Sequence, residues 1–420
     1  MQISFGRFTD SFKTKTQSDC WTETVNLFEQ KKYFDSYKLF IKYISNPKGD
    51  NIKSYESDGT LKIEFIQGSK MITVNITDKK ITAESIIAKC EKLSISYMRR
   101  LLELNYSLFY SRFTLNNNLI SIKFDSSILD CFPEKLYYAL KELSVKADKQ
   151  DDLLLDEFST LKPTENSPII SLSDDIRKLK LEYFKKWIND TINMISALNE
   201  NTFDGGISYL LLSLLYRIDY LLTPEGSLVD EIENISSEYF SKEEKKWVEK
   251  NSNMRDKFKK LLSKPDEEIL KSFYITISTF SILNPVFHQP IVDIIDRNIG
   301  NVKYYVDNNY EEIALRIYEY IAGYCFYSYG MAKPVAKLLQ LVYRIVLPGF
   351  FNSFDSQNVL FNESDKKLDE DLIKRTIASI IDEDKEQFPE LSFNSGNLKF
   401  DSRLNFLSTF FNEFKTLKYN

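Results

Sequence analysis

The single histidine of the 420 residues, His288, limits the acid–base and metal chemistry that this chain could perform. It follows Pro285 at the start of a helical pattern, so we interpret it as a helix-end residue and not as a general base. Asp293 and Asp296 lie three residues apart and would share one helical face, as two catalytic carboxylates could. Arg297 is adjacent, which favours a solvated charged face over a catalytic pair.

The sequence also lacks the glycine-rich and nucleophile motifs of common enzyme classes. It contains no Gly-x-x-x-x-Gly-Lys or Gly-x-Gly-x-x-Gly phosphate loop and no Gly-x-Ser-x-Gly elbow. The cysteines, Cys20, Cys90, Cys131 and Cys325, are too scattered to indicate a zinc site or a disulfide framework. We therefore predict no catalytic residue, no cofactor and no metal site.

Three aromatic residues, Tyr106, Phe109 and Tyr110, are the candidates for a partner-binding site. They lie where a predicted helix ends and the chain turns toward a hairpin around Phe113 and Ile122. The three side chains cannot all point into one core. Two alternatives are open, namely packing against the C-terminal half and binding a partner.

The stretch over residues 97–124 predicts the elements that position these aromatics, a helix followed by a hairpin. Five residues at core spacing, in this stretch and in the next predicted helix, are expected to be buried: Leu101, Leu102, Phe113, Ile122 and Leu140.

The preceding residues alternate in hydrophobicity and predict antiparallel strands at 52–55, 61–65 and 71–76. Residues 81–90 fit either a fourth strand or a short helix. With a helix or helical hairpin from residue 19 and a helix after Pro133, the predicted fold is an α+β domain, an antiparallel sheet with flanking helices.

The segment from Trp21 to Asp156 resembles the YbjN-like domain, which shares the fold of type III secretion chaperones. The resemblance rests on Leu101–Asn105, on Ser111–Leu115 with its polar turn, and on the helix ending in Asp151–Leu154. It implies a non-enzymatic binding domain that pairs through this helix and hairpin, so that a homodimer is one expected partner arrangement.

Four segments make up the predicted domain organisation. Residues 1–18 are expected to be a flexible arm, 19–156 the α+β domain, and 157–172 a linker rich in Pro, Ser and Thr. Residues 173–420 carry helical periodicity throughout and predict an all-α domain. Within it, residues 207–222 are apolar nearly all round and predict a central buried helix.

Composition and charge argue against nucleic-acid binding and against a membrane-spanning helix. The net charge is −6, with a small positive excess in the first third, and no basic stripe indicates nucleic-acid binding. No apolar run reaches the roughly 18 residues of a membrane helix. No leader-like apolar segment begins the sequence, so we expect a cytoplasmic location.

These observations favour a non-catalytic protein that binds a protein or peptide, in the manner of a chaperone or regulator. One alternative is an enzyme with a carboxylate and tyrosine site in the helical half. Another is a structural component of a larger complex.

Overall fold

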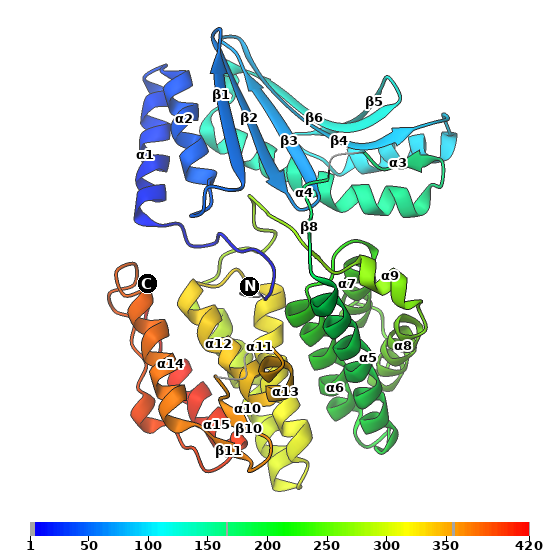
Figure 1. Cartoon of the computed structure of the whole chain (residues 1–420), viewed down its shortest axis with the longest axis vertical. Coiled ribbons are helices and arrows are strands. Elements are labelled where there is room, and N and C mark those ends of the chain that lie inside the picture. The colour runs from blue at the N-terminus through cyan, green and yellow to red at the C-terminus, as the bar shows by residue number, and fades with distance from the viewer. Residues whose placement is uncertain (1–4, 165–166, 355–357, 420) are drawn as a thin grey trace.

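The computed structural model describes residues 5–164, 167–354 and 358–419. It shows an N-terminal antiparallel sheet with flanking helices, followed by a helical part (Figure 1). The predicted fold class is confirmed.

A seven-stranded antiparallel sheet organises the α+β part, in the order β1-β2-β3-β4-β6-β5 with β7 paired to β4. Along β3, Ile72, Val74 and Ile76 are buried and the residues between them point outward, so one face carries the core. Residues 81–90 lie in a strand and not in a helix. The strands are β1 (Ile52–Ser57), β2 (Thr60–Gln67), β3 (Lys70–Ile76), β4 (Lys80–Cys90), β5 (Arg112–Asn116), β6 (Leu119–Ser127) and β7 (Leu161–Lys162).

Four helices flank this sheet: α1 (Lys15–Glu29), α2 (Tyr33–Ile44), α3 (Ile95–Tyr106) and α4 (Pro133–Glu157). The long helix α4 packs against β2, β3, β4 and β6 and covers the core face. Helix α1 starts at Lys15, four residues before the predicted start, because Thr14 and Gln17 form a reciprocal capping box.

Four of the five expected core residues, Leu101, Phe113, Ile122 and Leu140, are buried as predicted. The fifth prediction is wrong, because Leu102 is 70% exposed. Successive helical residues point about 100° apart, so a helix that buries Leu101 against the sheet turns Leu102 away from it.

The rest of the described chain is mainly helical and contains two short strand pairs. Residues 207–222 are buried as predicted, apart from the partly buried Tyr209, in α6 and in the π-helical turn η2 that follows it. No helix among the described residues is long and apolar enough to cross a membrane. The helices are α5 (Asp174–Ser196), α6 (Asp204–Arg217), η2 (Ile218–Leu222), α7 (Ser227–Tyr239), α8 (Trp247–Leu262), α9 (Asp266–Lys271), α10 (His288–Asp307), α11 (Glu311–Ser328), α12 (Lys333–Val346), α13 (Pro348–Asn352), α14 (Glu370–Glu383) and α15 (Arg403–Phe414).

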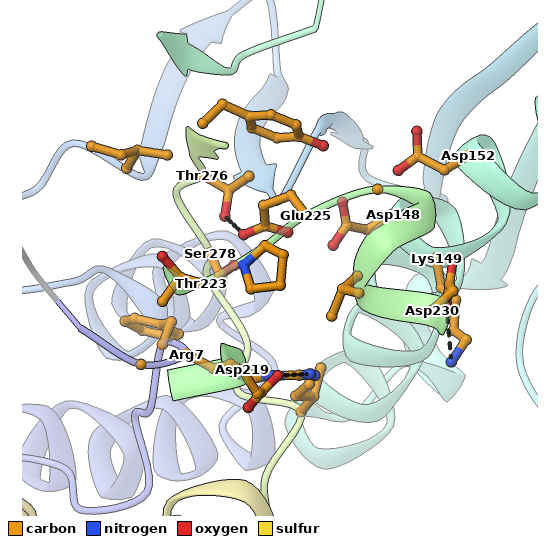
Figure 2. A pocket seen from close by; sticks show the side chains of 18 of the residues that line it. Arg7, Asp148, Lys149, Asp152, Asp219, Thr223, Glu225, Asp230, Thr276 and Ser278 are labelled. Carbon is orange, nitrogen blue, oxygen red and sulfur yellow. Dashed lines mark hydrogen bonds and ion pairs between the residues drawn. The ribbon is translucent and has the colours of Figure 1, made fainter. Parts of the chain in front are cut away.

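The described residues of the N-terminal arm, from residue 5 onward, lie against the helical part. The Gly6 amide donates to the Tyr220 carbonyl at 2.8 Å, and the Arg7 guanidinium lies 2.5 Å from Asp219. This ion pair is largely buried. The arm, α4 and the helical part together surround a cavity of about 350 Å³ (Figure 2).

Residues 272–287, between α9 and α10, hold the α+β part and the helical part together, and we call this segment the joint. The Gln67 side chain accepts hydrogen bonds from the amides of Thr279 (3.1 Å) and Phe280 (2.9 Å) and donates to the Phe280 carbonyl (3.2 Å). The Gly68 amide donates to the Ile277 carbonyl at 2.9 Å. Backbone groups of Ile277, Thr279 and Phe280 thus form hydrogen bonds with Gln67 and Gly68, at the end of β2.

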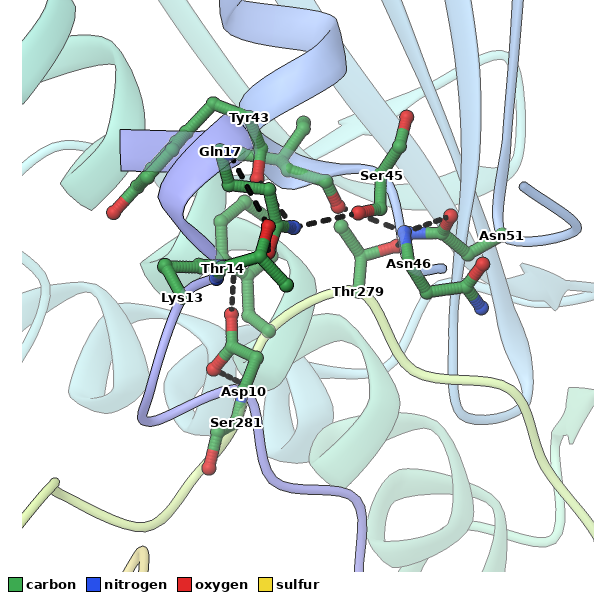
Figure 3. A network of polar contacts seen from close by, with 12 residues as sticks. Asp10, Lys13, Thr14, Gln17, Tyr43, Ser45, Asn46, Asn51, Thr279 and Ser281 are labelled. Atoms are coloured by element: carbon green, nitrogen blue, oxygen red, sulfur yellow. Dashed lines mark hydrogen bonds and ion pairs between the residues drawn. The ribbon is translucent and has the colours of Figure 1, made fainter. Parts of the chain in front are cut away.

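Side chains complete this joint (Figure 3). Asn51 donates to the Thr279 hydroxyl at 3.0 Å, and that hydroxyl donates to the carbonyl of residue 66 at 2.8 Å. The Phe280 ring enters the core of the α+β part, with ring centroids 5.7 Å from Phe65 and 5.3 Å from Tyr137. One core is therefore built from residues more than 200 positions apart.

Candidate functional site

One face of α3 presents an uninterrupted apolar stripe to solvent. Ile95, Met98, Leu102 and Tyr106 follow one another at intervals of three and four residues, so they share a helical face. All four are exposed, and Tyr106 reaches 96%. Single exposed apolar residues are common on protein surfaces, whereas here four of them are contiguous on one helix face.

The opposite face of α3 fixes the helix to the sheet. Tyr97 and Leu101 are buried there. The Tyr97 hydroxyl shares a hydrogen bond with the Cys90 sulfur at 2.6 Å and donates to the Lys92 carbonyl at 3.1 Å. The contacts of Tyr97 and Leu101 fix the orientation of α3 about its own axis, so the stripe faces solvent in the folded chain.

The turn after α3 is held by one carboxylate, Glu142 on α4. Its oxygens accept hydrogen bonds from the amides of Phe109 (2.8 Å), Tyr110 (2.9 Å) and Ser111 (2.9 Å), and from the Ser111 hydroxyl (2.8 Å). Burial alone would raise the pKa of Glu142, but these donors outweigh it and hold the pKa below its usual range. The turn thus holds a carboxylate in its charged form and is itself held in one conformation.

A second side chain ties the end of α3 to the hairpin. The Asn105 amide accepts a hydrogen bond from the Phe113 backbone amide at 2.6 Å and donates to the Phe113 carbonyl at 3.1 Å. Tyr106 and Phe109 are consequently displayed from a braced backbone, which lowers the conformational entropy that a binding event must remove.

The predicted partner-binding residues lie together at this end of α3. Tyr106 and Phe109 are 96% and 90% exposed, and Tyr110 is 39% exposed. Figure 1 shows α4 between α3 and the helical part. The exposure excludes the alternative that Tyr106 and Phe109 pack against the helical part.

The other residues weighed for chemistry are explained by local structure. His288 begins α10, and its Nε2 lies 3.2 Å from the Lys415 carbonyl. Burial lowers the pKa of His288, which favours the neutral ring. Asp293 accepts from Gln289, and Asp296 pairs with Lys415 at 2.9 Å, so the two carboxylates form a charged surface as interpreted.

Sequence reasoning missed the two residues that shape this site. Glu142 lies 31 positions from Ser111 on another helix, and no local pattern connects them. The core spacing of Leu102 predicts burial, but its place in the series 95, 98, 102, 106 is also the signal of a second apolar face on α3.

No protein-family model matches this chain, and no curated protein sequence matches it.

Proposed function

We propose that this chain is a non-catalytic binding protein that docks a protein partner on the apolar face of α3. The observation that carries the proposal is the display of Tyr106 and Phe109 on a turn fixed by Glu142. Large aromatic side chains on a rigid support are the usual anchors of protein interfaces, because they bury much area for little lost rotamer freedom.

The pattern of α3 fits a second copy of the same helix. In an antiparallel pair with its two-fold axis near residues 100 and 101, Ile95 would meet Tyr106 and Met98 would meet Leu102 of the other copy. Arg99 would then lie near Glu103 of that copy, so charges of opposite sign would flank the apolar seam. Such self-complementarity is what a two-fold interface requires.

The resemblance to YbjN-like domains leads to the same expectation of pairing. The four thiols, which form no disulfide, fit the cytoplasmic location expected from the sequence. We therefore propose a homodimer of a chaperone-like or regulatory protein, with α3 as its seam.

The test compares the full-length chain with a variant that carries Leu102→Ser, Tyr106→Ser and Phe109→Ser. Light scattering over a concentration series should show a dimer for the original chain and a monomer for the variant. A Leu129→Ser change, at a residue that is 67% exposed outside this face, is the matched control and should leave the dimer intact. A monomeric original chain at high concentration would contradict the proposed pairing.

A further inference from the structure

The cavity between the two parts of the molecule is built from several segments that are distant in sequence. The arm contributes Arg7, α4 contributes Asp148 and Asp152, the chain before α7 contributes Glu225, and the joint contributes Thr276. Its volume of about 350 Å³ lies within the range of small-molecule sites. It lies between the α+β and helical parts, a common position for ligand sites.

Every cationic side chain that lines this cavity is already engaged. Arg7 pairs with Asp219 at 2.5 Å and with Glu233 at 2.7 Å. Lys149 lies 2.9 Å from Glu233 and also approaches Asp230.

The third cation, Lys180, donates to the Leu222 carbonyl at 2.7 Å and to the Thr223 hydroxyl at 3.0 Å. Lys180 is 3% exposed, so its ammonium is fixed at the end of η2. Arg7 and Lys180 also attract the Glu225 carboxylate at longer range, but neither forms an ion pair with it.

Three further carboxylates that line the cavity, Asp148, Asp152 and Glu225, form no ion pair within 4 Å among the described residues, although Arg7 attracts Glu225 and Lys70 attracts Asp152 at longer range. Asp148 accepts from the Ser69 amide at 2.7 Å, and Glu225 accepts from the Thr276 hydroxyl at 3.0 Å. Figure 2 shows the Asp148 and Glu225 carboxylates facing the same space.

Asp152 is the least satisfied of the three, with no hydrogen bond or ion pair to any residue that the structure describes. Its Oδ2 lies within 4 Å of the place that a Cβ at Gly226 would occupy, and so does the Tyr274 hydroxyl. The absence of a side chain at Gly226 leaves room beside both polar groups.

Burial is the largest cause that raises the pKa of Asp148, Asp152 and Glu225, each to about 7, and neighbouring carboxylates add to it. Carboxylates in this state release protons readily when a cation arrives. The cavity thus combines carboxyl groups that form no ion pair with space for a ligand.

The remaining walls decide what kind of cation fits. Val145, Ile176, Val229 and Ile282 line the cavity with aliphatic surface, and Phe280 adds an aromatic ring. Among the described residues, no three Cys, His, Asp or Glu side chains are grouped to hold a metal ion. These apolar walls supply too few oxygen ligands for an ion that needs six or more of them. An alkyl chain that ends in ammonium groups could instead place its methylenes on the apolar walls and its charges at the carboxylates.

We propose that this cavity binds an aliphatic di- or polyamine, with its ammonium groups at Asp148, Asp152 and Glu225 and its methylenes on the apolar walls. The site is separate from α3, so it adds a small-molecule ligand to a protein-binding molecule.

Calorimetric titration of the full-length chain with spermidine and with 1,4-diaminobutane, at about pH 8, tests the proposal. We expect binding of at least one amine, no binding of the uncharged 1,4-butanediol, and release of protons that increases as the pH is lowered toward about 7. Equal binding of the diol would overturn the charge argument. A lack of heat and of thermal stabilisation with both amines would overturn the site.

Variants locate the binding. Glu225→Gln and Asp152→Asn should each weaken amine binding by on the order of tenfold or more, since a charge-assisted hydrogen bond contributes about 1.5–3 kcal/mol. Glu390→Gln, an exposed carboxylate outside the cavity, is the matched control and should leave affinity unchanged. If both cavity variants keep full affinity while folding normally, the amine binds the surface by charge alone and the proposal is wrong.

Discussion

Most proteins bury apolar side chains and expose charged ones, and the α3 face and the cavity between the two parts depart from this rule in opposite ways. On α3, the apolar side chains of Ile95, Met98, Leu102 and Tyr106 are exposed to solvent. In the cavity, the charged side chains of Asp148, Asp152 and Glu225 are only partly exposed. Exposed apolar area is relieved by covering it with another apolar surface, and enclosed carboxylates are relieved by a cation or a proton. We therefore propose two ligands of different size and chemistry, a protein at the α3 face and a small amine in the cavity.

Their construction differs as well. The α3 face lies within the α+β part and is braced by Glu142 and Asn105, so it needs nothing from the helical part. The cavity exists only where the two parts meet, because Thr276 and Phe280 from the joint form one of its walls. Changes at the joint should therefore separate the two sites.

The largest effect is expected from Phe280→Ala, which removes a ring that is 1% exposed from the core of the α+β part. Losing a buried Phe costs about 3–5 kcal/mol, and here that cost falls on the joint. Chemical denaturation should report the loss of stability, and proteolysis between residues 157 and 172 should accelerate. Amine binding should disappear while dimerisation through α3 persists. Loss of both functions together would show that the two sites are not independent.

A smaller effect is expected from Glu142→Ala, which frees the turn that carries Phe109. Three backbone amides lose a charged acceptor, but they are partly exposed and can turn to water, so we expect a loss of about 1–2 kcal/mol. Dimerisation should weaken although no apolar residue has changed.

The same carboxylate gives the α+β part a pH dependence of known sign. Because the pKa of Glu142 is lower in the folded protein, its stabilising contribution is present above the unfolded-state pKa. It should be lost as the pH falls through the lower folded value. If the free energy of unfolding of the Glu142→Gln variant falls with decreasing pH as steeply as that of the original chain, this assignment is wrong.

The cavity should give the opposite pH dependence. The pKa values of Asp148, Asp152 and Glu225 lie at about 7 in the folded protein, above their unfolded values, mainly because of burial. Between about pH 4 and pH 7 the folded state holds protons that the unfolded chain has released, so the free energy of unfolding falls as the pH rises. The slope is about 1.4 kcal/mol per pH unit for each such proton at most, and Glu225→Gln should flatten it. Thermal unfolding across this range measures it.

The smallest effect is expected from Tyr106→Ser alone. This side chain makes almost no contact in the folded chain, so the free energy of unfolding should change by no more than about 0.5 kcal/mol. Dimerisation should nevertheless weaken, and this separation of stability from association distinguishes a binding residue from a core residue. A large loss of stability would place Tyr106 in the core.

A feature could be predicted from the sequence when the residues that form it are close together in the chain, and not when they are far apart. Period-two patterns such as Ile72, Val74 and Ile76 are local, and they predicted the sheet correctly. Leu102 was misplaced because a helix with two apolar faces gives no sign of which face the sheet covers. The joint between Gln67 and Phe280 spans 213 positions, and pairing at that distance leaves no local pattern.

The candidate sites show the same limit. The sequence singles out Tyr106 and Phe109 as surplus apolar residues at a helix end, but it leaves open whether they are covered by the helical part or exposed; the structure shows them exposed. The cavity could not be predicted, because Asp148, Asp152 and Glu225 look like ordinary surface carboxylates until the two parts come together.

Disulfide trapping tests the central claim, pairing of α3 with a second copy, most directly. In the proposed antiparallel pair, Met98 would lie beside Leu102 of the other copy, so a full-length Met98→Cys, Leu102→Cys variant should form covalent dimers under mild oxidation. Adding Tyr106→Ser and Phe109→Ser to that variant should abolish them. If the double-cysteine chain stays monomeric while its new thiols react freely with a maleimide, α3 does not pair with itself.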